Sequence, residues 1–252
     1  MSKVVYEKSR GLTDNPLSYC PGCAHGIIHK IVADTLTSLD VLERTIAIAP
    51  VGCSVMAYEF YNCDGIQAGH GRAPAVATGV KRTNPDKIVF TYQGDGDLAA
   101  IGAAEIVHAA HRGENITVIF VNNAIYGMTG GQMAPTTLID MKTSTSPKGR
   151  AEAGTGKPLL VSEMLAQIPS VAYIERVSIH DVPNINKTKK AVKKAFQNQI
   201  DGKGFSMVEI LSTCPIGWNK TPSASLKFIE TNMVPYFPLG VFADSPAKEV
   251  AE

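Results

Sequence analysis

The sequence predicts an α/β protein in which a doubly wound, mostly parallel sheet carries helices on both faces. Two observations support this fold. Strand-like and helix-like patterns alternate along nearly the whole chain of 252 residues. In addition, residues 87–123 read as strand, glycine-rich turn, helix and strand, which is the βαβ unit of a parallel sheet. No second core of different composition is apparent, so we expect residues 1–252 to form one domain.

The expected elements follow in chain order. Apolar residues recur with helical spacing from Ile27 to Leu36, which predicts a helix over 24–39. Short apolar runs predict strands, and longer amphipathic or small-residue segments predict helices. The expected strands cover 45–49, 87–92, 116–121, 171–179 and 205–211. The remaining expected helices cover 73–82, 98–111, 159–168 and 187–200.

Composition narrows the class of protein. Apolar residues make up 44% and charged residues 19% of the chain, and the formal net charge is only +1. This balance gives no reason to expect binding to nucleic acid or to a membrane surface. No stretch approaches the roughly 20 apolar residues that span a bilayer, and the first residues lack an apolar signal core. We therefore expect a cytoplasmic protein whose five cysteines are metal ligands or buried thiols rather than disulfides.

The turn of the βαβ unit carries the most informative motif. It reads Gly-Asp-Gly-Asp over 94–97, and the second strand ends in Asn122 and Asn123. Both strand ends should lie on one edge of the sheet, which brings Asp95 and the Asn side chains together. A carboxylate, an amide oxygen and a nearby carbonyl suit Mg²⁺ bound to a phosphate, and the glycines allow backbone N–H groups to approach a diphosphate. The alternative is an ordinary tight turn followed by a polar strand end.

Four cysteines occupy similar places in the predicted fold. Cys20 and Cys23 form a Cys-x-x-Cys knuckle before the first helix, while Cys53 and Cys214 each follow a strand. From the residues alone, three interpretations stay open, namely a [4Fe–4S] cluster, a zinc ion, or a redox pair with unrelated core thiols. Cys63 fits none of these positions and is expected to be a free thiol.

Two segments break the alternation of strands and helices. Residues 124–158 are rich in Gly, Pro, Ser and Thr, and a connection of this length is usually functional or mobile. Because it begins beside the Asn pair, we expect it to cover a cofactor. Residues 215–252 are rich in Pro and aromatic residues, so we expect this tail to pack on the chain itself or on a partner.

Taken together, these motifs resemble the β subunit of 2-oxoacid:ferredoxin oxidoreductases over about residues 16 to 220. The resemblance rests on five separated motifs that occur in one order, at 20–26, 52–54, 70–79, 94–97 and 122–132. Residues 51–137 are most similar to the branched-chain members, which act on 2-oxoisovalerate. This family binds thiamine diphosphate on an α/β fold of the kind expected here.

The resemblance implies the ligands and cofactors. It implies Mg²⁺ bound by the side chains of Asp95 and Asn123 and by the carbonyl of Ile125. It implies one [4Fe–4S] cluster on Cys20, Cys23, Cys53 and Cys214. It implies contacts to thiamine diphosphate from Val51, Gly52, Cys53, Ser54, His70, Gly94, Gly96, Asp97, Tyr126, Gly127, Met128 and Thr129.

The implied reaction is a CoA-dependent oxidative decarboxylation of a 2-oxoacid to acyl-CoA and CO₂, with electrons passing through the cluster to ferredoxin. The glutamate that activates the aminopyrimidine ring should come from an α subunit, and γ and ferredoxin-like subunits are further expected partners. The isolated chain should therefore be inactive. Two rival interpretations are a non-oxidative thiamine enzyme with structural zinc, and a cofactor-binding scaffold without turnover.

The sequence does not identify a catalytic side chain. The candidates are His70, Arg72 and Met128. His70 could face the cofactor, or it could cap the next helix or hydrogen-bond within its own loop. Residues 54–57 and Met128 should form an apolar wall that favours 2-oxoisovalerate, whereas 2-oxoglutarate would need Lys or Arg there. Arg72 could still serve 2-oxoglutarate, and pyruvate is a third alternative. We expect His25 and His29 to be surface or second-layer residues rather than metal ligands.

Overall fold

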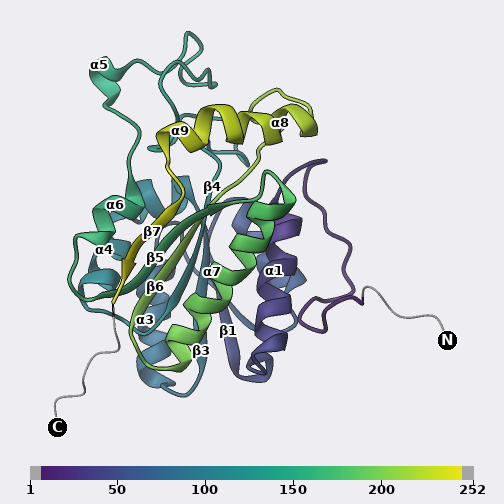
Figure 1. Ribbon diagram of the computed structural model, residues 1–252, viewed down its shortest axis with the longest axis vertical. Helices are drawn as coiled ribbons and strands as arrows, with labels where there is room; N and C mark the ends of the chain where they lie inside the picture. The colour runs from purple at the N-terminus through teal and green to yellow at the C-terminus, as the bar shows by residue number, and fades with distance from the viewer. Residues whose placement is uncertain (1–6, 246–252) are drawn as a thin grey trace.

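A computed structural model describes residues 7–245, which build one seven-stranded sheet in the order β2-β1-β3-β4-β6-β5-β7 (Figure 1). Neighbouring strands are parallel except β5 and β7, which are antiparallel. The strands are β1 Thr45–Ala49, β2 Asp64–Gln67, β3 Ile88–Gly94, β4 Thr117–Asn122, β5 Val171–Ser178, β6 Phe205–Leu211 and β7 Gly240–Asp244.

Helices cover both faces of the sheet, which confirms the predicted doubly wound fold (Figure 1). α1 and α7 pack on one face, and α3, α4 and α6 pack on the other. Each face has its own apolar core, because the buried strands present apolar side chains in both directions. The helices of these two layers are α1 His25–Ser38, α3 Ala73–Thr83, α4 Ala103–His111, α6 Val161–Ala166 and α7 Val182–Ile200.

The predicted elements all occur, with small shifts at their ends. The largest shift is at α7, which begins at Val182 rather than at residue 187. Asp181 caps this helix by accepting a hydrogen bond from the backbone N–H of Asn184 at 2.7 Å, and Pro183 occupies the first turn. The local capping residues therefore extend the helix beyond its apolar pattern.

Two strands were not predicted. β2 is exposed at all four of its residues, so it lacks the apolar alternation that identifies a strand. It exists because its backbone pairs with β1 at the sheet edge. β7 lies in the aromatic tail and pairs with β5 at the opposite edge. Backbone pairing at an edge leaves little trace in side-chain pattern.

The predicted helix over 98–111 is interrupted. Gly96–Ile101 forms a π-helical turn, closed by the N–H of Gly102 donating to the carbonyl of Asp97 at 2.8 Å, and α4 follows. Single π-helical turns often mark functional sites. Here the turn places Asp95, Gly96 and Asp97 directly after β3.

The tail and the long connection lie over one end of the sheet (Figure 1). The tail contains α8 Pro222–Phe228, the π-turn Ile229–Met233 and α9 Val234–Tyr236, and it packs on the core beside α1 and α7. The connection 124–158 holds one short helical segment, α5 Glu152–Thr155. The hydroxyl of Tyr236 donates to the carbonyl of Pro158 at 3.0 Å, which joins tail and connection. Contact of the tail with a partner stays a prediction, and residues 246–252 of it lie outside the described part.

Short turns precede and follow β1, namely the 3₁₀ turns Leu42–Arg44 and Cys53–Met56 and the helical turn α2 Ala57–Phe60.

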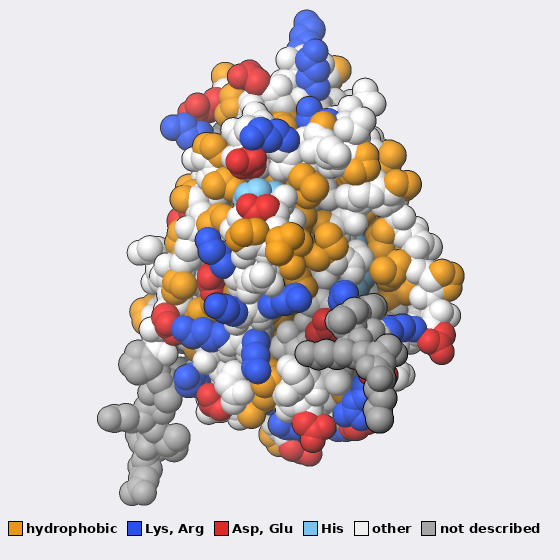
Figure 2. Space-filling view, turned by 45° about the vertical axis from the view of Figure 1, so that its right-hand side comes forward, with side chains coloured by type: hydrophobic (Ala, Val, Ile, Leu, Met, Phe, Trp, Pro, Cys, Tyr) orange, Lys and Arg blue, Asp and Glu red, His pale blue; other side chains and the backbone are white. Residues whose placement is uncertain are grey.

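Figure 2 shows one face of the molecule, on which acidic and basic side chains are mixed and hydrophobic side chains gather above a band of Lys and Arg. Across residues 7–245, none of the helices has the length and apolar character needed to traverse a membrane.

Candidate functional site

The carboxyl ends of β1, β3 and β4 surround one cavity. β1 and β3 are neighbours, and the chain leaves them in opposite directions along the sheet, so this is the topological switch point where α/β proteins bind ligands. All the predicted cofactor contacts line it, namely Val51, Gly52, Cys53, Ser54, His70, Gly94, Gly96, Asp97, Tyr126, Gly127, Met128 and Thr129. The predicted Mg²⁺ ligands Asp95, Asn123 and Ile125 line it as well, and so does His25, which the sequence did not predict as a cofactor contact. We call this space the cofactor pocket.

Asp95 is a buried carboxylate at the start of the π-turn. One oxygen accepts from the backbone N–H of Gly96 at 2.9 Å, and the other accepts from the hydroxyl of Thr136 at 2.7 Å. Burial raises the pKa of Asp95 to about 6, although these donors and the N–H groups of Ala124 and Ile125 oppose the shift. A carboxylate placed here without a cation is therefore costly to ionise.

Gly96 has no room for a side chain. A Cβ at this position would lie 2.1 Å from Cε1 of Tyr126, whose hydroxyl donates to the Gly96 carbonyl at 3.1 Å. The close packing of Tyr126 on the Gly96 backbone shapes the pocket wall. This contact requires a glycine at position 96.

Asn123 and Ile125 belong to a tight turn after β4. Ala124 adopts a left-handed conformation with φ 60°, which is unusual for a residue with a Cβ. The turn is fixed from three sides. The Asn123 carbonyl accepts from Trp218 Nε1 at 2.9 Å, the Ala124 carbonyl accepts from the Thr137 hydroxyl at 2.6 Å, and the Asn123 Oδ1 accepts from the Ile125 N–H at 3.2 Å.

The expectation that both Asn side chains meet Asp95 is wrong for Asn122. Its amide donates to Glu209 Oε1 at 2.8 Å, inside the protein, and Asn122 does not line the cofactor pocket. Successive side chains of a strand point to opposite faces, so only one of two adjacent Asn residues can turn toward the pocket.

His70 lines the pocket and is held by Asp97. Its Nδ1 lies 2.5 Å from Oδ1 of Asp97, which also accepts from the Gly71 N–H at 2.7 Å. The second oxygen of Asp97 accepts from Gln93 Nε2 at 2.7 Å. A carboxylate at Nδ1 fixes the ring orientation and leaves Nε2 for the pocket. Burial raises the pKa of Asp97, and its three donors counter this effect.

The other two catalytic candidates, Met128 and Arg72, differ in whether they line the cofactor pocket. Met128 lines the pocket, with 49% of its surface exposed. Arg72 is not among the residues that line the pocket, and its guanidinium forms an ion pair with Glu105. The expected apolar wall is also smaller than predicted, because Val55 and Ala57 line neither this pocket nor its neighbour, and Ala57 is fully buried.

The four cysteines line a second cavity of about 400 Å³, which we call the cysteine cavity. Burial raises the pKa of Cys23 to about 11 and that of Cys214 to about 12, and it also raises that of Cys53. The two cavities share five residues, namely His25, Cys53, Asn123, Gly127 and Met128. Gly127 lies between them, and a Cβ there would lie 3.1 Å from the Cys214 sulfur.

The cysteine side chains do not converge on one point. Within 7–245, no three His, Cys, Asp or Glu side chains are spaced to hold a metal ion. All five cysteines are free. Cys63 is absent from the lining of the cysteine cavity and packs against the core beside α1 and α7.

His25 and His29 are not surface residues, which corrects one of the two expectations for them. They are 2% and 0% exposed and belong to an aromatic cluster beside the cysteines. His25 Nδ1 lies 2.6 Å from the Tyr92 hydroxyl, and His29 Nε2 lies 2.8 Å from the Tyr19 hydroxyl. Desolvation lowers the pKa of His25 to about 4 and that of His29 well below its usual value, so both rings are neutral near pH 7.

Three residues of the site carried no usable signal in the sequence. Thr136 reaches Asp95 from the long connection, and Gln93 supports Asp97 from within β3. Arg150 is buried and donates to five carbonyls of the connection, those of Ala134, Pro135, Thr137, Thr155 and Lys157. Each role depends on chain folding between distant positions, so local spacing could not reveal it.

Comparison with known proteins identifies the family of the chain. Residues 50–210 match the family described as thiamine pyrophosphate enzyme, C-terminal TPP binding domain. The chain is 45% identical to ketoisovalerate oxidoreductase subunit VorA of Methanothermobacter thermautotrophicus, over 97% of this chain and 51% of the relative. It is 34% identical to 2-oxoglutarate synthase subunit KorB of Methanocaldococcus jannaschii, over 87% of this chain and 79% of the relative.

A solved structure has the same fold over nearly the whole chain. It is a 2-oxoglutarate:ferredoxin oxidoreductase from Magnetococcus marinus with 2-oxoglutarate, coenzyme A and succinyl-CoA bound, and its chain is 26% identical with a TM-score of 0.78, over 98% of this chain and 88% of that chain. The present chain spans about half the length of the VorA relatives. The family match covers the Gly-Asp-Gly-Asp motif and, of the four cysteines that line the cysteine cavity, only Cys53. The alignments with two KorB relatives cover most of both chains. The chain therefore belongs to the thiamine pyrophosphate enzymes, within the group of 2-oxoacid oxidoreductase subunits.

Proposed function

We propose that this chain is the thiamine diphosphate-binding β subunit of a CoA-acylating 2-oxoacid:ferredoxin oxidoreductase. The proposal rests mainly on one observation, which is that the cofactor pocket and the cysteine cavity share five lining residues. A pocket for an organic cofactor beside a cavity with four thiols suits an enzyme that passes substrate electrons to a metal cluster.

The cofactor pocket fits Mg²⁺ and a diphosphate. Asp95 is a buried carboxylate whose contacts are hydroxyl and backbone N–H donors, so a divalent cation would compensate for its charge. Asp95, Asn123 and the Ile125 carbonyl would hold the ion, and the backbone at Gly96 would approach the diphosphate. When bound, thiamine diphosphate supplies the electron sink that decarboxylation of a 2-oxoacid requires.

The chain's own side chains orient the reacting groups. Asp97 fixes the ring of His70, which leaves His70 Nε2 available as a hydrogen-bonding group within the pocket. Tyr126 packs against Gly96 and narrows the pocket. Val51 and Met128 are 37% and 49% exposed, so these apolar groups would exclude water once a partner subunit covers them.

The cysteine cavity fits a [4Fe–4S] cluster better than a zinc ion. A zinc ion needs all four sulfurs about 2.3 Å from one point, whereas a cluster binds each thiolate through a different iron. The four thiols share one cavity without converging on one point. The backbone at His25 and at Gly217 lowers the pKa of Cys23 and of Cys214, respectively, against the effect of burial, which favours the thiolate that a cluster binds.

The substrate we propose is 2-oxoisovalerate. The chain is 45% and 46% identical to two ketoisovalerate oxidoreductase subunits, against 31–34% for the 2-oxoglutarate relatives. Met56 and Met128 add apolar surface to the cysteine cavity, and the one nearby Arg candidate, Arg72, is paired with Glu105. A dicarboxylic substrate would need an unpaired cation at this place.

The complete active site requires partners. We propose an α subunit that supplies the pyrimidine-binding domain, together with γ and ferredoxin-like subunits and ferredoxin as the electron acceptor. The five free cysteines suit a reducing compartment, and we place the complex in the cytoplasm.

Metal analysis of the complex, purified without oxygen, tests the cofactors. We expect about four iron and four sulfide per chain of this type, in addition to those carried by the ferredoxin-like subunit, together with Mg²⁺ and thiamine diphosphate. Replacement by Ser of Cys20, Cys23, Cys53 or Cys214 should each reduce the iron content. Cys63→Ser is the matched control and should leave the iron content unchanged. Zinc in place of iron would refute the proposed electron transfer.

Substrate specificity is tested by ferredoxin reduction with CoA and one of three substrates, 2-oxoisovalerate, 2-oxoglutarate or pyruvate. The complex should prefer 2-oxoisovalerate, and this chain alone should show no turnover with any of them. A strong preference for 2-oxoglutarate would contradict the argument from the apolar surface and the paired Arg72.

A further inference from the structure

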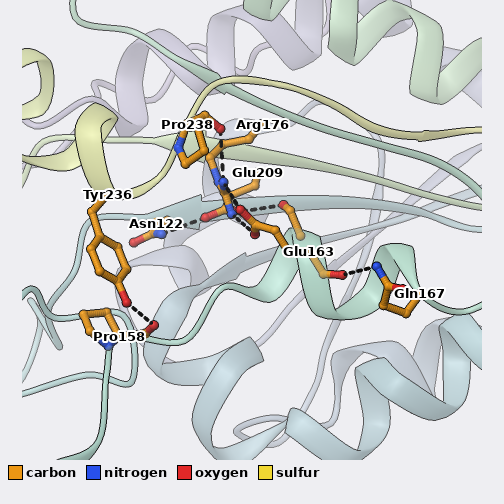
Figure 3. A network of polar contacts seen from close by, with 9 residues as sticks. Asn122, Pro158, Glu163, Gln167, Arg176, Glu209, Tyr236 and Pro238 are labelled. Atoms are coloured by element: carbon orange, nitrogen blue, oxygen red, sulfur yellow. Dashed lines mark hydrogen bonds and ion pairs between the residues drawn. The ribbon is translucent and has the colours of Figure 1, made fainter. Parts of the chain in front are cut away.

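A buried ion-pair network lies next to the turn that follows β4 (Figure 3). Its centre is Arg176 of β5, which is 0% exposed and donates from Nε to Glu209 Oε2 at 2.8 Å. Arg176 also forms a two-pronged pair with Glu163 of α6, at 2.8 and 2.5 Å. Its Nη1 donates to the Pro238 carbonyl of the tail at 3.1 Å. The network therefore joins two strands, a helix and the tail.

Glu209 extends this network to β4. Its Oε2 also accepts from the Ser162 hydroxyl at 2.5 Å, and its Oε1 accepts from Asn122 Nδ2 at 2.8 Å. In the register of β4 and β6, Glu209 pairs with Phe120 and Leu211 pairs with Asn122, so Glu209 and Asn122 are diagonal neighbours on one face of the sheet. Both are fully buried.

Asn122 links Glu209 to the turn that follows β4. Its Oδ1 accepts from the N–H of Ala124 at 3.1 Å. Ala124 is the residue with φ 60°, a conformation that is unfavourable for a residue with a Cβ and needs support from its surroundings. The residue on either side of it, Asn123 before and Ile125 after, lines the cofactor pocket.

The network is an expensive way to stabilise a fold. Burying charged groups costs desolvation, and a buried pair often stabilises no more than apolar side chains of the same volume. The charged and polar groups of this network are, however, hydrogen-bonded to one another. The chain of hydrogen bonds ends at the N–H of Ala124, whose backbone conformation is strained. This favours a role in fixing geometry over a role in stability alone.

We propose that Glu209 and Asn122 are positioning residues for the cofactor pocket, because they hold the left-handed turn that directs Asn123 and Ile125 to the Mg²⁺ position. The inference rests on the proposed function of the pocket. It assigns a role to the Asn residue that faces away from the pocket, next to the Asn that faces into it.

The test is the Mg²⁺ concentration that half-saturates thiamine diphosphate binding, measured by titration calorimetry on the complex purified without oxygen. Asn122→Ala removes both hydrogen bonds of the side chain and should raise this concentration about tenfold or more, as is typical when a residue that orients a metal ligand is lost. The melting temperature is measured on the same samples, because a purely structural role would change only that quantity.

A paired exchange provides the rescue. N122D alone places two carboxylates together and should weaken Mg²⁺ binding. In the double variant N122D/E209Q, the carboxamide at position 209 donates to the carboxylate at position 122. That carboxylate still accepts from the Ala124 N–H, and the carboxamide oxygen at position 209 still accepts from Arg176 and Ser162. The total charge is unchanged. The double variant should return to within about threefold of the wild-type half-saturation, since the hydrogen-bond chain is restored with one donor reversed.

Glu163→Gln is the matched control. Glu163 contacts the same Arg176, but its side chain is 28% exposed and it does not contact Asn122. This variant should lower the melting temperature while leaving the Mg²⁺ half-saturation within about twofold. Equal weakening by Glu163→Gln and Asn122→Ala would overturn the proposal, as would wild-type affinity in Asn122→Ala. Failure of the wild-type complex to bind Mg²⁺ and thiamine diphosphate at all would instead remove the proposed function, and the inference with it.

Discussion

Gly96 provides a direct test of how the pocket wall is built. In Gly96→Ala the new Cβ would lie 2.1, 2.4 and 2.6 Å from three ring atoms of Tyr126. Ordinary contact begins near 3.4 Å, so the ring must retreat by about 1.3 Å. That movement breaks the 3.1 Å hydrogen bond from the Tyr126 hydroxyl to the Gly96 carbonyl.

The expected cost follows from these two effects. Forcing extra volume into a packed position costs about 1–3 kcal/mol, and the lost hydrogen bond adds about 1 kcal/mol. Alanine's higher helix propensity offsets up to about 1 kcal/mol of this. We therefore expect Gly96→Ala to lower the free energy of unfolding by about 1–3 kcal/mol, and to weaken cofactor binding because Tyr126 lines the pocket.

Urea denaturation of the purified protein measures the effect. Gly94→Ala is the control, since a Cβ at Gly94 meets nothing within 4 Å and the residue lies two positions before Gly96, at the end of β3. Combining Gly96→Ala with Tyr126→Ala removes the obstructing ring, so the glycine substitution should cost less in that background, with a coupling energy of about 1 kcal/mol or more. A Gly96→Ala protein as stable as the Gly94→Ala control would refute the steric argument.

Three further predictions follow from contacts near the site. Thr136→Val removes the donor to Asp95 and should cost about 1–3 kcal/mol in the free energy of unfolding, measured in urea. Arg150→Met leaves five carbonyls without their donor and should increase hydrogen exchange across 124–158 while that of the sheet stays unchanged. Burial raises the pKa of Cys63 to about 12, so only about one part in 10⁴ is thiolate at pH 8. In metal-free protein, alkylation of Cys63 should be much slower than that of exposed Cys20 and should accelerate as the pH rises, and equal rates at pH 8 would contradict the burial.

The sequence by itself determined the order of elements and the pocket that they surround. The βαβ unit carries Asp95 and Asn123 at fixed strand ends, and parallel strands bring such ends together by geometry. The same rule brings Cys53 and Cys214 toward the Cys20–Cys23 knuckle, and all four line one cavity. These features are local or depend on parallel pairing, so motifs in one chain suffice to predict them.

Tertiary structure decided which way each side chain turns and which distant group meets it. Asn122 and Asn123 look alike in sequence, yet one joins Glu209 and the other faces the pocket. Arg72 meets Glu105, and His25 contacts aromatic rings from two other segments, those of Tyr19 and Tyr92. The edge strands β2 and β7 depend on backbone pairing with neighbours remote in the chain. Contacts between remote positions are set by the packing of the whole fold, because burial and hydrogen bonding there outweigh local preference.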